Sequence, residues 1–191
     1  ANGATYKVAP KILEEIGAEV FVYNNTPDGT NINQDCGSTK PEFMSKAVKQ
    51  NLADIGIALD GDGDRVILSD HEGTIIDGDT ILAIAAIDMQ RDECLNDAVV
   101  GTVISSLSLE RTLSNYNIAL TRTEVGDKYI IHELRNTEAN LGGEPSGHVV
   151  FPDHSTTGDG LITALQILSA MRRTGKSLKE LSEIMVKTIG K

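Results

Sequence analysis

The sequence predicts an α/β fold made of two consecutive α/β modules with mixed sheets. The main observation is that apolar residues with helical spacing alternate along the chain with short stretches rich in β-branched residues. A second observation is the composition, because 191 residues with 40% hydrophobic and 24% charged side chains are typical of a globular protein with a real core.

The first half of the chain alternates helix and strand. Val8, Ile12 and Ile16 share one helical face before Gly17, which predicts a helix over residues 8–16. Its other expected elements are a β-branched and aromatic strand over 20–23, a helix opened by Pro41, a buried strand over 55–59, and a hairpin of 66–69 with 74–76. A long loop rich in turn formers separates the 20–23 strand from the Pro41 helix.

The second half repeats this alternation. The expected elements are a helix over 80–89, a strand over 98–105, a helix over 107–116, a strand over 119–125, a helix over 128–135, a loop and strand over 142–151, and helices over 160–171 and 178–185. No linker rich in Pro or Ser interrupts the chain. We therefore expect a tight boundary near Asp77, between modules at 1–77 and 78–191.

Charge and cysteine content narrow the possible partners and location. The chain has 17 basic and 28 acidic residues, so its net charge of −11 disfavours binding to nucleic acid or to an anionic membrane. Cys36 and Cys94 form no CxxC pair, which disfavours zinc ribbons and disulfide scaffolds and favours the reducing cytoplasm. No apolar run is long enough to cross a bilayer, and the first residues do not resemble a signal peptide.

An acidic loop follows the buried strand at 55–59. Asp60, Asp62 and Asp64 alternate with glycines that let the backbone curl, so the three carboxylates can converge on one point. Pairs of carboxylates about 4 Å apart repel by about 4 kcal/mol at an effective dielectric of 20, and a divalent cation removes that repulsion. A ligand set made only of oxygen favours Mg²⁺, and Arg65 offers a fork of donors to a phosphate.

Two familiar loop types are excluded for this segment. An EF-hand starting at Asp60 needs Gly and Glu where Arg65 and His71 stand. A dinucleotide-binding GxGxxG motif fails at Val66, and no P-loop motif occurs in the chain. A plain solvated acidic turn is the alternative to a metal site.

A second polar loop, GGEPSGH, offers a carboxylate, a hydroxyl and an imidazole. Glu144, Ser146 and His148 suit the hydroxyl groups of a sugar, although a plain β-turn is the alternative. The segment is not a GxSxG elbow, which disfavours a Ser-His-Asp hydrolase.

Two lesser signals also precede expected helices. Lys128 could meet an anion or lie on a solvated surface. The TTGDG segment is best interpreted as a turn and helix cap.

Five blocks occur in one order along the chain. They are ANGATYKVAP, NINQDCGST, DGDGDR with VILSDHEGTIIDGD after it, VGDKY, and GGEPSGHVVF running into TTGDGLITALQIL. Together they resemble the α-D-phosphohexomutase superfamily, and most of all bacterial phosphoglucosamine mutases. Members have four domains, and this chain resembles the second, which carries the metal loop, and the third, which carries the sugar loop. The resemblance implies a fragment whose partners are the missing first and fourth domains of the parent chain.

The resemblance also implies an activity, an isomerisation that interconverts glucosamine 6-phosphate and glucosamine 1-phosphate through a phosphoserine and a bisphosphate. The nucleophilic serine belongs to the first domain, so the fragment alone is expected to be inactive. The implied site residues are Asp60, Asp62 and Asp64 for Mg²⁺, Arg65 as the catalytic residue that stabilises the phosphoryl group, and Lys128, Glu144, Ser146 and His148 for the phosphosugar substrate. Pro145 stands where Gln is more usual in the glucosamine enzymes, so glucose or mannose phosphate is an alternative substrate.

Two other function classes are open. A haloacid-dehalogenase-like phosphatase also has a DxDx segment after a buried strand, and there Asp60 would be the nucleophile and Asp62 the acid. A non-catalytic module that binds sugar phosphates is the other class.

Overall fold

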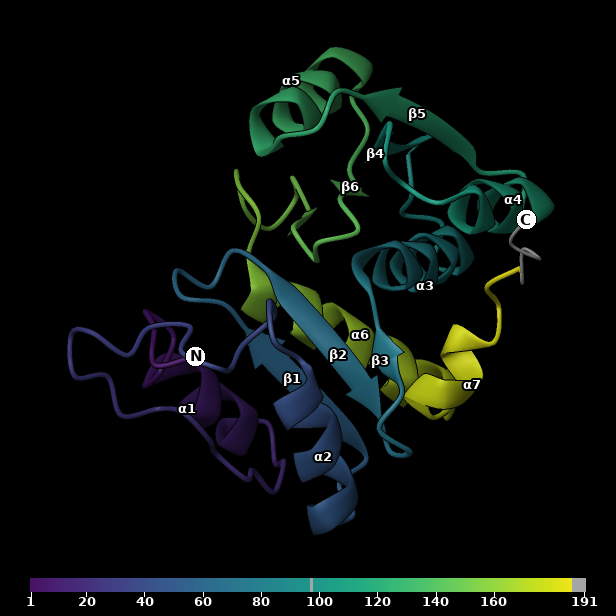
Figure 1. Ribbon diagram of the computed structural model, residues 1–191. Helices are drawn as coiled ribbons and strands as arrows, with labels where there is room; N and C mark the ends of the chain where they lie inside the picture. Colours follow the sequence, from purple (N-terminus) through teal and green to yellow (C-terminus); the bar gives the residue numbers. More distant parts are fainter. Residues whose placement is uncertain (97, 187–191) are drawn as a thin grey trace.

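The computed structural model describes residues 1–96 and 98–186, and it confirms the α/β class (Figure 1). The strands are β1 Ile55–Leu59, β2 Val66–Asp70, β3 Ile75–Ile76, β4 Ala98–Thr102, β5 Ala119–Thr123, β6 Gly142–Gly143 and β7 Val149–Val150. The helices are α1 Val8–Glu15, α2 Glu42–Asn51, α3 Gly78–Arg91, α4 Leu107–Asn115, α5 Asp127–Thr137, α6 Gly160–Thr174 and α7 Leu178–Ser182. They surround two sheets, ordered β1-β2-β3 and β5-β4-β6-β7.

The first sheet is an antiparallel ladder. In the register of β1 and β2, Leu59 pairs with Val66, so the acidic loop is the connection at one end of the ladder. The expected hairpin between β2 and β3 is confirmed, with Gly73 at φ +81 in its turn. The helices α2 and α6 contact opposite faces of this sheet (Figure 1).

The expected strand over residues 20–23 is wrong. This segment forms no ladder with the described strands, and Phe21, Val22 and Tyr23 are exposed. A cavity of about 250 Å³ lies between the segment and β1, and residues of α1 and α2 line its other walls. A β-branched sequence becomes a strand only when a neighbouring strand takes its backbone hydrogen bonds, and here the cavity separates the segment from β1.

The second sheet is mixed. In its centre β4 pairs in parallel with β5 and β6, and β7 pairs antiparallel with β6. Val99 and Val100 point to opposite faces of β4, as neighbours in a strand do, so Val100 packs with α5 and Val99 joins the main core. The strand ends at Thr102, earlier than expected, because the Ser105 hydroxyl accepts a hydrogen bond from the Thr102 backbone N–H at 3.1 Å and the chain turns there.

The helix α3 lies at the centre of the molecule. Its residues are buried on almost every side, because α4, α6, α7 and β6 all contact it. The last two helices, α6 and α7, also pack against β2 of the first sheet. A module boundary near Asp77 therefore stays a prediction. None of the helices within 1–96 and 98–186 is long and apolar enough to span a bilayer.

The start of α3 depends on one capping residue. Asp77 Oδ1 accepts hydrogen bonds from the Thr80 backbone N–H at 2.9 Å and from the Thr80 hydroxyl at 2.7 Å. Replacing Asp77 with alanine is expected to lower the free energy of unfolding by about 1 kcal/mol, measured by urea denaturation. Asp54→Ala, which removes an exposed carboxylate outside any helix, is the control. Equal stability of the two variants would contradict the cap.

Candidate functional site

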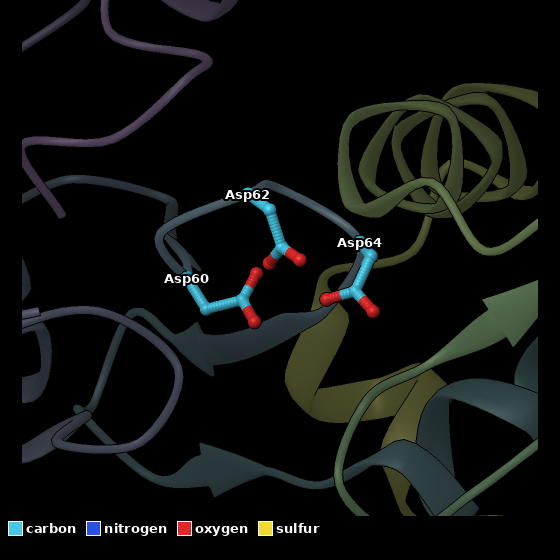
Figure 2. Close-up of side chains that lie close together, drawn as sticks. All are labelled: Asp60, Asp62 and Asp64. Carbon is cyan, nitrogen blue, oxygen red and sulfur yellow. The ribbon is translucent and has the colours of Figure 1, made fainter. Parts of the chain in front are cut away.

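The acidic loop brings its three carboxylates together. Asp60, Asp62 and Asp64 each place one ligand atom so that all three lie within 4.8 Å of one another (Figure 2). The loop closes through a hydrogen bond from the Asp60 N–H to the Arg65 carbonyl at 3.4 Å, and Gly63 turns the chain at φ +80. Because all three donors are carboxylate oxygens, the cluster could hold a metal ion, as the spacing in the sequence indicates.

Arg65 balances the most buried of these charges. Its Nε donates to Asp60 Oδ2 at 2.7 Å and to Asp64 Oδ1 at 3.3 Å, and its backbone N–H donates to Asp60 Oδ1 at 3.2 Å. The Asp60 side chain is 0% exposed, so an unpaired charge there would be costly. Burial lowers the pKa of Arg65, but the neighbouring Asp60 and Asp64 outweigh this effect and raise it.

The phosphatase alternative gains no support from these contacts. Both carboxylate oxygens of Asp60 accept hydrogen bonds from Arg65, and the side chain is buried.

Asp64 is the member of the cluster that contacts the other polar loop. Burial, a hydrogen bond shared with Asp60 and the negative charges of Asp60 and Asp62 raise the pKa of Asp64, and nearby His148 acts in the opposite direction. Its Oδ2 lies 3.1 Å from Nδ1 of His148. The structure thus joins two predicted site residues that are far apart in the sequence.

The GGEPSGH loop is a tight turn between β6 and β7. The Glu144 N–H donates to the His148 carbonyl at 2.9 Å, and the Gly147 N–H donates to the Glu144 carbonyl at 3.0 Å. The half-buried Glu144 carboxylate accepts from the Gly126 N–H at 3.0 Å and lies 3.4 Å from the exposed Ser146 hydroxyl. The segment is therefore a turn, and it also presents the carboxylate and the hydroxyl side by side.

The predicted substrate residues separate into two groups. Glu144 and Ser146 lie together, whereas His148 is buried and faces the acidic loop. Lys128 is exposed at the start of α5, and its ammonium lies 4.7 Å from the centre of the Tyr129 ring. Glu144 does connect to the segment that carries Lys128, through the Gly126 N–H.

Backbone contacts hold the acidic loop against both neighbouring loops. Arg65 and His148 form an isolated antiparallel bridge, and the Val66 N–H donates to the Gly147 carbonyl at 3.1 Å. The Gly160 N–H donates to the Gly63 carbonyl at 2.8 Å. We call this set of contacts the seam.

Glycines make the seam possible. A Cβ on Gly147 would overlap the Val66 carbonyl oxygen, and one on Gly78 would overlap the Glu144 carbonyl oxygen. A Cβ on Gly160 would lie 2.6 Å from the Arg65 carbonyl oxygen. Each of these glycines permits an approach of two backbones that no side chain allows.

Sequence reasoning missed part of the TTGDG segment. Asp159 caps α6 as expected, because its Oδ1 accepts from the Leu161 and Ile162 N–H groups, both at 2.9 Å. Gly158 and Gly160 also pack on the site, against the His148 ring and the acidic loop. The only signal was the pair of glycines beside the cap, and glycine is equally common in ordinary turns.

Two family models together match nearly the whole chain. The model described as phosphoglucomutase/phosphomannomutase, alpha/beta/alpha domain II matches residues 1–73, and the model for domain III of the same enzymes matches residues 77–188. The chain belongs to the phosphoglucomutase/phosphomannomutase family. The resemblance found in the sequence is therefore confirmed.

Curated relatives in this family include phosphoglucosamine mutases. The one from Geobacter metallireducens is 52% identical over 187 residues, which are 97% of this chain and 42% of that protein. The one from Rhizobium rhizogenes is 53% identical over 181 residues, which are 94% of this chain and 40% of that protein. The chain thus spans less than half the length of these relatives.

Solved structures of other proteins share the fold. A phosphoglucomutase/phosphomannomutase family protein from Burkholderia thailandensis has a TM-score of 0.86 at 27% identity, covering 98% of this chain and 42% of that one. An N-acetylphosphoglucosamine mutase from Aspergillus fumigatus, solved with GlcNAc-6P and magnesium, has a TM-score of 0.73 at 18% identity, covering 94% of this chain and 47% of that one.

Proposed function

We propose that this chain belongs to a phosphosugar mutase that interconverts glucosamine 6-phosphate and glucosamine 1-phosphate. In this proposal the acidic loop, residues 60–65, is the metal loop, and the GGEPSGH loop, residues 142–148, is the substrate loop. The observation that carries the proposal is the meeting of the two loops, in which His148 of one contacts Asp64 of the other. Relatives named phosphoglucosamine mutase, 52% identical across nearly the whole chain, support the choice of sugar.

We propose Mg²⁺ as the cofactor, held by Asp60, Asp62 and Asp64. The donor set supports this choice, since three carboxylates offer hard oxygen ligands and leave positions for phosphate oxygens. When bound, the ion would neutralise the acidic loop and polarise a phosphoryl oxygen. Arg65 uses Nε for its carboxylate partners, and we assign its terminal amino groups to the phosphoryl group in transfer.

We propose that Glu144 and Ser146 bind the sugar hydroxyl groups and that Lys128 binds an anionic group of the substrate. The side chains of Glu144 and Ser146 differ in donor and acceptor character and lie side by side, which suits recognition of a sugar ring with several hydroxyl groups. The phosphoryl-carrying serine and a second phosphate clamp would come from parts of the parent enzyme outside this chain.

We also propose a boundary between the two modules near Asp77. We propose a cytoplasmic location as well, which the free cysteines Cys36 and Cys94 support.

A chimera tests the proposed activity. The chain replaces the matching 187 residues of the Geobacter metallireducens phosphoglucosamine mutase, and interconversion of the two glucosamine phosphates is assayed. Activity is expected for the chimera and not for the isolated chain. A folded chimera that acts on glucose or mannose phosphate instead would correct the sugar, and one inactive on all three would contradict the mutase.

Within that chimera, Glu144→Gln is expected to raise KM for glucosamine 6-phosphate about 5- to 150-fold. The reason is that a buried hydrogen-bonding group left without its charged partner costs about 1 to 3 kcal/mol. Glu124→Gln, which changes an exposed carboxylate beyond the end of β5, is the matched control. Loss of serine phosphorylation with unchanged sugar binding would show that Glu144 belongs to the transfer step instead.

A further inference from the structure

The imidazole of His148 has one polar partner in the described structure, and it is a proposed metal ligand. The side chain is 3% exposed, and Nδ1 lies 3.1 Å from Asp64 Oδ2. The other ring nitrogen, Nε2, is buried without a hydrogen-bond partner among the described residues. A metal-binding carboxylate is ionised and can only accept, so we assign the donor role in this contact to Nδ1.

The ring is held so that it cannot easily turn away. Its ring atoms face Gly158 so closely that a Cβ there would lie 2.6 Å from Nε2. Its backbone is fixed by the bridge to Arg65 and by the Glu144 N–H, which donates to the His148 carbonyl at 2.9 Å. The direction of the Nδ1–H group is therefore set by the substrate loop and by the segment before α6.

Asp64 needs such a partner. Its side chain is 34% exposed, and the negative charges of Asp60 and Asp62 favour rotation of the carboxylate into solvent. Arg65 Nε holds Oδ1 only at 3.3 Å, whereas His148 Nδ1 lies 3.1 Å from the other oxygen, Oδ2. Hydrogen bonds of this kind orient ligating carboxylates, and losing one typically costs 10- to 100-fold in metal affinity.

We propose that His148 is a positioning residue for the metal site: it holds Asp64 in the orientation that binds the cation. This inference rests on the metal site of the proposed function. It takes His148 out of the set of sugar ligands and gives the substrate loop a part in building the metal loop.

Two amide variants of the 191-residue chain test the role of Nδ1. In His148→Asn the amide nitrogen takes the place of Nδ1, and in His148→Gln it takes the place of Nε2. Mg²⁺ affinity is measured by NMR titration of the Gly61 and Gly63 amides, and the amides of β5 in the same spectra report whether each variant is folded. We expect His148→Gln to weaken Mg²⁺ binding about 10- to 100-fold and His148→Asn to stay within about threefold of the wild type.

The outcomes separate this inference from the metal site itself. If the wild-type chain binds no Mg²⁺, both the proposed metal site and the positioning role of His148 are contradicted. If the wild type binds and both variants bind as tightly, only the positioning role is overturned. Equal losses in two folded variants would also overturn it, because they would show that the volume of the ring matters and not the donor at Nδ1.

Discussion

Gly147→Ala is expected to lower the free energy of unfolding by about 2 to 5 kcal/mol. The backbone there has φ +91, where an L-residue pays about 1 to 2 kcal/mol, and the new Cβ would also overlap the Val66 carbonyl oxygen. An overlap with backbone cannot be relieved by a rotamer change, so overpacking adds about 1 to 3 kcal/mol. Urea denaturation measures the loss.

Gly29 provides the matched control for this prediction. It has the same φ of +91, but a Cβ there would meet nothing within 4 Å. Gly29→Ala should therefore show the backbone strain alone, about 1 to 2 kcal/mol. If both variants lose the same stability, the close approach at Gly147 contributes nothing to the fold.

Asp62→Asn is expected to weaken Mg²⁺ binding by on the order of 100-fold, because a unit charge at coordination distance is worth several kcal/mol even at a high effective dielectric. Asp62 is the exposed member of the cluster, so the fold should remain intact. NMR titration of the isolated chain measures the affinity, and Asp54→Asn, which makes the same charge change away from the loop, is the control. Unchanged affinity of Asp62→Asn would refute the ligand assignment.

The sequence predicts those elements that depend on local pattern. The helices α3 and α6 and the strand β1 appear where their apolar spacing places them. The segment at 20–23 has an equally strong strand composition, but a strand also needs a neighbour, and a cavity lies on the side of β1. Strand propensity does not include the partner, and that is why this prediction is wrong.

The candidate site shows the same limit. The convergence of Asp60, Asp62 and Asp64 follows from three carboxylates within one short loop. The direction of His148 depends on how β7 and the segment before α6 pack on the acidic loop. Asp64 and His148 are 84 positions apart in the sequence. No local pattern therefore encodes their contact.

The seam also determines where the molecule can move. A bisphosphate that turns over during the proposed reaction needs room, but the acidic loop and the substrate loop touch backbone to backbone, with no space even for one methyl group at Gly147. We therefore expect the two loops to move together. In the proposed enzyme, opening and closing around a substrate would then come from the parts that face this pair, and the distance between the proposed metal ligands and the proposed sugar ligands would stay unchanged.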